Sequence, residues 1–446
     1  MSGRGRALPL LLLAGSLLLG AGWPHPGGGL DGNRFAPGRG AFPGWRELVL
    51  PGVVPAWIVA LGDGQLAAVD PTGTFTVFRV TPEAIQAVAR FEGVGALNAS
   101  PVGVRLGDGP AGAAFVTREG RLALWRGGHV NVHDLPVTLS VLTHPTVVDV
   151  DADGRDELLA ITSDGAIALV SGLPNAVQVL DRLAIGALPD ARVSLTPEGE
   201  ALVLTQPTTR YAHGVFGDTV EPGAMTGVRV AARTLSLSAL LRLRQELVIE
   251  DRRIVVADVD GDGMADAVMT RASLTQGASV LALTRTEGRW ELLALGRPIG
   301  QPRRWEHTIG VADLDGSGAP TVVSVRTPHA GGVLQALRRK GSGLEIIARR
   351  PGVGSHVLGS RNLDQAALAD LDGNGRPEVV VPAQARDALL GVELAGNRFV
   401  DRWRLPLGGP IISNLVVADL DGDGRLDLAV ADAAGLRVFL SAKETP

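Results

Sequence analysis

One acidic loop between two apolar runs constrains this chain more than any other feature of its sequence. Residues 416–430 read VVADLDGDGRLDLAV, with oxygen-bearing side chains at positions 1, 3, 5 and 9 of the loop and a free backbone carbonyl at position 7. A hard cation such as Ca²⁺ takes about six to eight oxygen ligands, and glycine at position 6 permits the sharp turn. Without a cation, clustered carboxylates repel one another. The candidate ligands are the side chains of Asp419, Asp421, Asp423 and Asp427 and the carbonyl of Arg425.

The same loop occurs four more times, each time with glycine at position 6. The first two copies use Asp149, Asp151, Asp153 and Glu157 with the carbonyl of Arg155, and Asp258, Asp260, Asp262 and Asp266 with the carbonyl of Met264. The other two use Asp313, Asp315, Ser317 and Thr321 with the carbonyl of Ala319, and Asp370, Asp372, Asn374 and Glu378 with the carbonyl of Arg376. The repetition predicts calcium at five positions, and the copy at 313–321 carries the fewest carboxylates.

An EF-hand is the first alternative for such loops, because it uses similar spacing. It requires a bidentate Glu at position 12 and flanking helices. Position 12 is Ala160, Met269, Ser324, Val381 or Val430, and the flanks are β-branched runs such as RRIVVADV. The sequence therefore favours strand–loop–strand sites.

The five loops, spread over roughly residues 100–446, resemble the FG-GAP/VCBS repeat of integrin-α-like β-propellers. This resemblance implies a calcium-binding propeller with a binding or scaffold role outside the cytoplasm, directed at a protein or carbohydrate ligand. Enzymes also occur on propellers, so the fold alone does not exclude catalysis.

A strand–turn–strand unit repeats along the chain and sets the expected number of blades. It begins at 56–70, 112–126, 157–171 and 200–216, and again near Asp266, Thr321, Glu378 and Asp427. Repeats of about 40 to 50 residues are in the range of propeller blades. We expect an all-β, eight-bladed β-propeller over 45–446, with seven blades as the alternative if the first or fourth unit is incomplete. Units 1, 2 and 4 lack the carboxylates and are expected to bind no calcium.

The two ends of the repeat array predict how the array closes. The last unit provides only three strands, whereas the segment Trp45–Leu50 precedes the first unit and has no partner nearby in sequence. We expect Trp45–Leu50 to pair with Leu436–Leu440 and so to remove two free sheet edges. Residues 217–250 interrupt the period as an expected insertion in the fourth blade, and they fit either a strand or a helix.

The N-terminus has the pattern of an export signal. Arg4 and Arg6 precede the apolar run at 7–19, and small residues follow at 20–22. These features predict a cleavable signal peptide over 1–22, an uncleaved membrane anchor being the alternative. Residues 23–44 are rich in Gly and Pro and predict an extended surface leader, which resembles the leader of FG-GAP and PQQ-type propellers. That likeness keeps a quinoprotein dehydrogenase-like or polysaccharide lyase-like enzyme open as the alternative function.

Composition narrows the remaining possibilities. The net charge is −5, there is no Cys, and aromatic residues make up 4%, so nucleic-acid binding and a disulfide framework are not expected. Arg greatly outnumbers Lys, which suggests a GC-rich bacterial genome. We expect a monomer in the periplasm or at the cell exterior, without a stable membrane span after cleavage.

Other motifs favour structural readings. The GxGxxG match at 107–112 precedes a strand-like segment and no helix, which a dinucleotide site requires. His129 and His133 lie in a strand-like segment without the Glu of a zinc protease. The loop carboxylates recur at every repeat, unlike a single glycosidase pair. The cluster Arg303–His307, with Trp403 and Arg404, would line a ligand site or pack at the blade rim, and rim packing is favoured.

Overall fold

The structure, a computed structural model, describes residues 32–106, 111–231 and 233–442, and the regular elements in these ranges are all strands. The predicted signal peptide and the GxGxxG residues 107–110 lie outside the described residues. Among the described residues there is no helix long and apolar enough to cross a membrane. Because all regular elements are strands, the expectation of an all-β fold is confirmed for the described residues.

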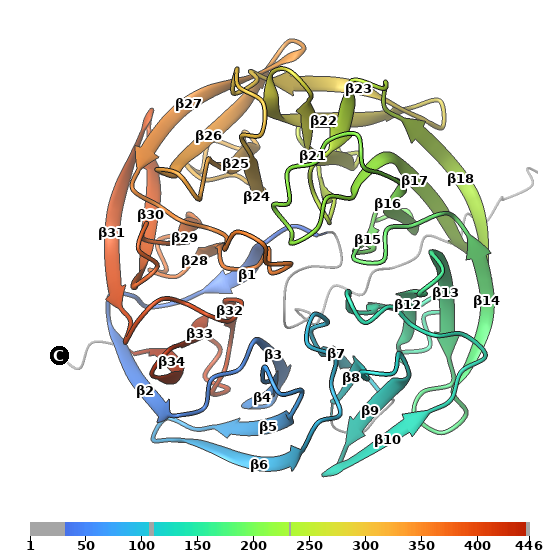
Figure 1. Cartoon of the computed structure of the whole chain (residues 1–446). Coiled ribbons are helices and arrows are strands. Elements are labelled where there is room, and N and C mark those ends of the chain that lie inside the picture. Colours follow the sequence, from blue (N-terminus) through green and yellow to red (C-terminus); the bar gives the residue numbers. More distant parts are fainter. Residues whose placement is uncertain (1–31, 107–110, 232, 443–446) are drawn as a thin grey trace, which may run out of the picture.

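The strands form sheets that radiate from a common centre, which is the arrangement of a β-propeller (Figure 1). The first four sheets are β3–β6 (Trp57–Gly62, Gln65–Val69, Phe75–Val80, Ile85–Phe91), β7–β10 (Val102–Val104, Gly112–Val116, Leu122–Arg126, His129–His133), β11–β14 (Thr146–Val148, Glu157–Ile161, Ala166–Ser171, Gln178–Ala184) and β15–β18 (Ser194–Leu195, Glu200–Thr208, Glu221–Ala231, Thr234–Arg242).

The remaining strands continue the same arrangement. They are β19–β23 (Leu247–Ile249, Val255–Ala257, Asp266–Ser273, Gly277–Thr286, Arg289–Gly296), β24–β27 (Glu306–Ala312, Thr321–Arg326, Val333–Lys340, Gly343–Pro351), β28–β31 (Ala367–Asp370, Glu378–Pro382, Ala388–Ala395, Arg398–Pro406) and β32–β34 (Val416–Ala418, Asp427–Asp432, Gly435–Ser441). A short parallel pair joins β23 to β27, so these two groups form one nine-stranded sheet.

Burial explains the two kinds of strand pattern in each sheet. The inner strands are buried on both faces, as in β12, where all five residues are buried. The outermost strands alternate between buried and exposed residues, as in β31. Strands covered on both faces read as continuous apolar runs, whereas a half-exposed strand keeps its period of two.

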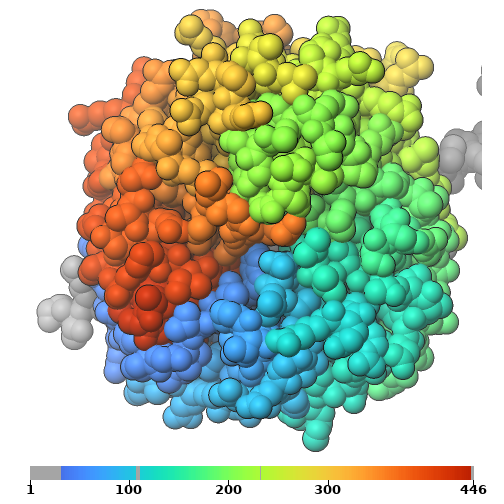
Figure 2. All heavy atoms as spheres, in the orientation of Figure 1, coloured from blue at the N-terminus to red at the C-terminus, as the bar shows by residue number. Residues whose placement is uncertain are grey.

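The N-terminal strand β2 (Trp45–Pro51) completes the last sheet, whose order is β2-β34-β33-β32. Its register pairs Arg46 with Leu440 and Leu50 with Leu436, which agrees with the pairing predicted from the sequence. The sequence colours run once around the face in Figure 2, so the blue first sheet and the red last sheet lie side by side.

Over residues 32–44, where the structure describes the expected leader, the segment is extended and largely exposed, and a few buried residues anchor it. Residues Phe35–Arg39 form β1, which pairs in parallel with β28. Arg34 and Phe42 are buried. The segment therefore belongs to the packed fold, because its backbone pairs with the innermost strand of a sheet.

Two expectations about the repeating strand–turn–strand units need correction. The unit at 56–70 is β3 and β4, the first and second strands of its sheet, whereas the unit at 157–171 is the second and third. The unit at 200–216 is not a hairpin, because β16 pairs with β17 across the intervening residues 209–220. Residues 217–250 thus contain two strands of the fourth sheet and β19 of the next sheet, rather than an insertion.

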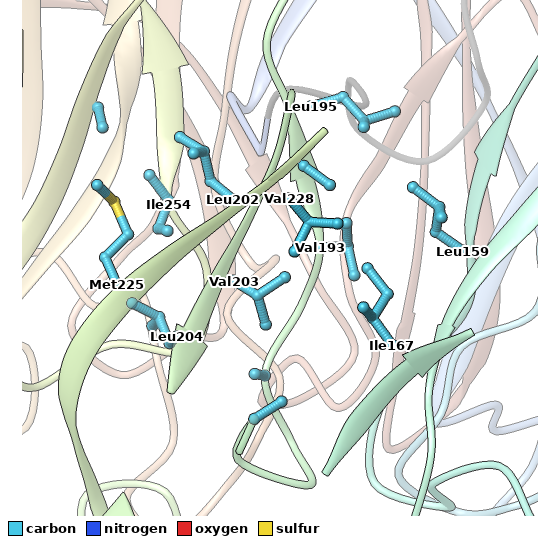
Figure 3. Close-up of a cluster of buried hydrophobic side chains, with 14 of the residues drawn as sticks. Leu159, Ile167, Val193, Leu195, Leu202, Val203, Leu204, Met225, Val228 and Ile254 are labelled. Atoms are coloured by element: carbon cyan, nitrogen blue, oxygen red, sulfur yellow. The ribbon is translucent and has the colours of Figure 1, made fainter. Parts of the chain in front are cut away.

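Hydrophobic cores fill the spaces between neighbouring sheets. In the cluster of Figure 3, Leu159 and Ile167 face Val193 and Val203, while Met225 and Ile254 extend the contact to the next sheet. Burying a Leu, Ile, Val or Met side chain contributes roughly 1.5–3 kcal/mol. These repeated layers hold the sheets in fixed relative positions and so position the loops between strands.

Candidate metal centre

All five acidic loops occupy equivalent places, because each joins two consecutive strands that pair with each other in antiparallel fashion. The first carboxylate ends or directly follows the first strand, as Asp370 does in β28 and Asp419 does after β32. The ninth residue begins the second strand in every copy, as Asp427 begins β33. The loop length is therefore fixed by two strands that pair with each other.

One hydrogen bond recurs in all five loops and shapes the turn. The amide of the glycine at position 6 donates to the carboxylate at position 1, for example from Gly263 to Asp258 Oδ2 at 2.9 Å and from Gly424 to Asp419 Oδ2 at 2.9 Å. The corresponding donors to Asp149, Asp313 and Asp370 are Gly154, Gly318 and Gly375. Each of these five glycines has a positive φ, which favours glycine over residues with a side chain.

The position 9 carboxylate is anchored from the other side in four loops. It accepts from the amide of residue 2, as from Leu371 to Glu378 Oε2 at 2.7 Å and from Leu420 to Asp427 Oδ2 at 2.8 Å. Glu157 and Asp266 make the same contact. All four carboxylates are buried, and Asp266, Glu378 and Asp427 are fully so.

In four loops three carboxylates converge, with one oxygen of each within 4.8 Å of the others. The groups are Asp149, Asp151 and Glu157; Asp258, Asp260 and Asp262; Asp370, Asp372 and Glu378; and Asp419, Asp421 and Asp427. Within the described residues, Asp370 Oδ1 and Glu378 Oε1 are buried without a hydrogen-bond partner, as is Asp149 Oδ1. A buried carboxylate oxygen without a partner is costly, so these oxygens are suited to a cation.

The pKa values of the position 9 carboxylates are raised, because burial and nearby like charges disfavour the ionised form. Burial raises the pKa of Glu378 to about 8 and that of Asp427 to about 7, and nearby Asp372 and Asp421 add to these respective shifts. Burial also raises the pKa of Glu157 and of Asp266. A divalent cation between the carboxylates would reverse this tendency, because an opposite charge favours the ionised form.

The loop at 313–321 differs from the other four. Asp315 Oδ1 lies 2.7 Å from Arg338 Nη2, and the Nε of Arg338 donates to Thr321 Oγ1 at 3.0 Å. Burial acts to raise the pKa of Asp315, but hydrogen bonding from Ser317 and the Arg338 guanidinium lower it to about 2. The negative charge of Asp315 is thus balanced by the guanidinium of Arg338.

Several basic side chains at these loops were not predicted from the sequence. Arg105 lies 2.7 Å from Asp156 and 3.3 Å from Asp149, and Arg39 lies 3.4 Å from Asp370. Arg105 and Asp149 belong to different sheets. Only the fold brings such pairs together, so no local sequence signal identifies them.

The cluster expected at Arg303–His307 does not form one site with Trp403. Trp305, Glu306 and His307 are buried, and Trp305 stacks on His307 and on His329. Trp403 packs instead on Phe42, in a different core. The packing interpretation therefore holds for both tryptophans.

A second charged region, missed by the sequence analysis, lies at the centre of the molecule. We call Arg34, Arg192, Arg253 and Asp364 the axial cluster, because they border one cavity that is also lined by residues of β3, β7, β11 and β15. Asp364 accepts from Arg192 at 2.7 Å and from Arg253 at 2.9 Å, and Arg34 lies 3.9 Å away. These guanidinium groups hold the pKa of Asp364 well below its usual range, although burial acts to raise it.

The axial cluster also ties several sheets together through backbone carbonyls. Arg253 donates to the carbonyls of Thr308 and Ile309, and Arg34 donates to that of Leu415 at 2.7 Å. The four side chains of the axial cluster border a cavity of about 90 Å³. Pockets for small molecules are usually about 300–1,000 Å³, so this cavity is small for an organic cofactor.

Comparison with known proteins agrees with the fold. Residues 370–430 match the family model of the FG-GAP-like repeat. No curated protein matches the chain. The chain is thus a β-propeller that contains an FG-GAP-like repeat.

Three solved structures are similar in fold. A quinohemoprotein alcohol dehydrogenase from Comamonas testosteroni is 11% identical with a TM-score of 0.60, over 94% of this chain and 81% of that chain. Sqt1 of Saccharomyces cerevisiae is 6% identical with a TM-score of 0.55, over 92% and 100%. A europium-containing methanol dehydrogenase is 10% identical with a TM-score of 0.52, over 93% and 91%. At these identities the likeness concerns the fold alone.

Proposed function

We propose that this chain is an exported, calcium-stabilised, eight-bladed β-propeller that acts as a binding or scaffold module for a protein or carbohydrate ligand. The observation that carries the proposal is the recurrence of one acidic loop, with one hydrogen-bond pattern, between five pairs of consecutive strands. A catalytic carboxylate pair occurs once across a substrate-sized gap. A repeated site is instead typical of ions that stabilise the blades that carry it.

The strand order supports eight blades closed by the N-terminus. Dividing the nine-stranded sheet at its parallel β23–β27 pair yields eight groups of about four strands. The first and last groups are also joined at the centre, where Asn414 exchanges two hydrogen bonds of 2.8 Å with the backbone of Ile58. Removing both edges prevents the edge-to-edge association that an open array would permit.

The donors in the loops suit Ca²⁺. They are carboxylate, amide and hydroxyl side chains with backbone carbonyls, and hard cations prefer such oxygen ligands. In each of the four convergent loops the ion would be held by side chains at positions 1, 3, 5 and 9 and the carbonyl at position 7. A bound ion would neutralise the carboxylates and fix the turn between two strands.

A propeller enzyme is the second candidate, favoured by the fold likeness to two dehydrogenases. The small central cavity and its internally paired charges argue for the binding role. The absorption spectrum of the purified chain separates the two. A near-ultraviolet band from a bound quinone would support the enzyme, and its absence after reconstitution with quinone would support the binding module.

Export and ligand binding need separate tests. Mass spectrometry of the mature N-terminus is expected to find cleavage near Gly22 in a periplasmic or secreted protein, whereas an intact Met1 in the membrane fraction would contradict export. For the ligand, envelope proteins and glycans are captured on the purified chain with calcium and with chelator. Calcium-dependent capture that is weakened by Asp258→Ala, and unchanged by the exposed control Asp134→Ala, would support the proposal.

A further inference from the structure

The loop at Asp313–Thr321 combines weak acidity with an arginine that contacts two ligand positions, whereas the arginines at the other four loops each contact one ligand carboxylate. Its five ligand positions include only two carboxylates, Asp313 and Asp315. Resting on the proposed calcium role of the other loops, we infer that the guanidinium of Arg338 takes the place of the metal here. This blade is then held by an internal cation and binds no calcium.

The contacts of Arg338 span the loop where an ion would bridge it. Its Nη2 lies 2.7 Å from Asp315 Oδ1 at position 3, and its Nε donates to Thr321 Oγ1 at position 9, at 3.0 Å. The side chains of Arg338 and Asp315 are 25% and 17% exposed, so the pair is largely shielded from water. The guanidinium of Arg338 therefore supplies a permanent positive charge to the loop.

The remaining carboxylate of this loop is also satisfied without metal. Asp313 Oδ1 accepts from the amide of Ser317 at 3.2 Å, and Oδ2 accepts from that of Gly318 at 2.7 Å. In the loop at 370–378, by contrast, Asp370 Oδ1 and Glu378 Oε1 are buried without a partner among the described residues. Buried carboxylate oxygens without a partner thus occur in the loop at 370–378, whereas both oxygens of Asp313 accept backbone hydrogen bonds.

The register of the sheets shows an exchange of charge at one pair of positions. The pair Val322–Leu337 places Thr321 across from Arg338, since antiparallel neighbours advance in opposite directions. In the other four loops the residue at position 9 is acidic, and the residue opposite carries no positive charge. The corresponding pairs are Glu157 with Ser171, Asp266 with Thr284, Glu378 with Glu393, and Asp427 with Leu440. Loss of the position 9 carboxylate thus accompanies gain of the arginine.

The test is the number of calcium ions bound by the full-length mature chain, measured by equilibrium dialysis and native mass spectrometry. The wild type is expected to bind at the four convergent loops and not at a fifth. The double variant Thr321→Asp with Arg338→Thr reproduces the Asp266 and Thr284 pair and is expected to gain one ion. Thr321→Asp alone keeps the arginine and serves as the matched control that gains none.

A second comparison keeps the test independent of the folding of the double variant. Asp313→Ala is expected to leave the calcium count unchanged, whereas Asp258→Ala loses one ion. Five ions on the wild type, or the loss of one in Asp313→Ala, would overturn the inference. A wild type that binds no calcium ion would contradict the proposed function rather than the inference. The inference would be contradicted as well only if the double variant also binds no calcium ion.

Discussion

The axial cluster and the acidic loops both concentrate charge, but they balance it in opposite ways. Asp364 lies three residues before β28, and Asp370 closes the same strand, so the two regions sit at opposite ends of one short element. At the axis, Asp364 is paired with Arg192 and Arg253. At the loop, buried oxygens of Asp370 and Glu378 have no partner within the described chain.

This difference separates stability that is independent of metal from stability that depends on it. A buried carboxylate paired with guanidinium groups carries its counter-charge in every solution condition. A buried carboxylate cluster is stable only when an ion is supplied or protons are taken up. The inferred role of Arg338 places the loop at 313–321 in the first group.

The largest effect is expected at the axis. Asp364→Ala leaves the guanidinium groups of Arg192 and Arg253 buried without their carboxylate, and breaking such a pair typically costs about 3–5 kcal/mol of unfolding free energy. The loss should be the same in calcium and in chelator, measured by denaturant unfolding. The exposed pair of Asp401 with Arg350 is the control, since Asp401→Ala should cost about 0–1 kcal/mol. A loss that disappears in calcium would contradict the distinction.

An intermediate effect is expected in the last loop. Asp421→Ala removes the position 3 carboxylate from the group that includes Asp419 and Asp427. A single ion that binds only the folded state contributes about 2.7 kcal/mol at a hundredfold excess over its Kd. The variant should lose about this much of the calcium response and little stability in chelator, as thermal unfolding in both conditions will show. Equal losses in both conditions would mean that Asp421 acts by packing alone.

A smaller effect is expected from the buried histidines, which depend on pH and not on metal. His329 Nε2 lies 2.9 Å from His356 Nδ1, with His213 and Arg386 nearby. Burial lowers the pKa of His329 to about 4 and that of His356 to about 3, from about 6.5 when unfolded.

The direction of the pH dependence follows from linkage. Because the unfolded chain takes up these protons first, stability is full above pH 6.5 and falls as the pH drops toward about 4. His329→Gln should reduce this slope between pH 6.5 and 4 in saturating calcium, whereas the exposed control His129→Gln should not. A variant with the slope of the wild type would exclude His329 as a source.

The smallest effect is expected for Ser317→Ala. The Ser317 hydroxyl accepts from the amide of Ala319 at 3.3 Å, in the loop whose charge is balanced by Arg338. Its removal should cost about 0.5–1.5 kcal/mol, and it should leave the calcium response of thermal unfolding unchanged. A reduced calcium response would show that this loop does bind metal.

Local patterns predicted most of what is local in this molecule. The nine-residue loops begin and end at the expected residues, because the acidic spacing and the apolar flanks lie in one continuous segment. The pairing of Trp45–Leu50 with the last sheet was also predictable, because the final unit lacks a strand. The extended strand β17 was not predicted, since a connection of twelve residues, longer than the usual hairpin turn, separates it from β16.

Contacts between distant segments leave no local pattern in the sequence from which they could be predicted. Arg34 meets the residues around Asp364 more than three hundred positions away, and Arg338 reaches its loop only across a sheet register. Each arginine reads in the sequence as an ordinary polar residue. The burial that gives it a role appears only in the folded chain.

The most direct test of the account is thermal unfolding of the wild-type chain in excess calcium and in excess chelator, at one pH and ionic strength. Chelation leaves like charges crowded in four loops and removes the ions that bind only the folded state. We predict a clearly lower Tm in chelator, restored by added calcium and not by an equal concentration of sodium. Identical melting temperatures in calcium and chelator would show that these loops are not structural calcium sites and would contradict the central claim.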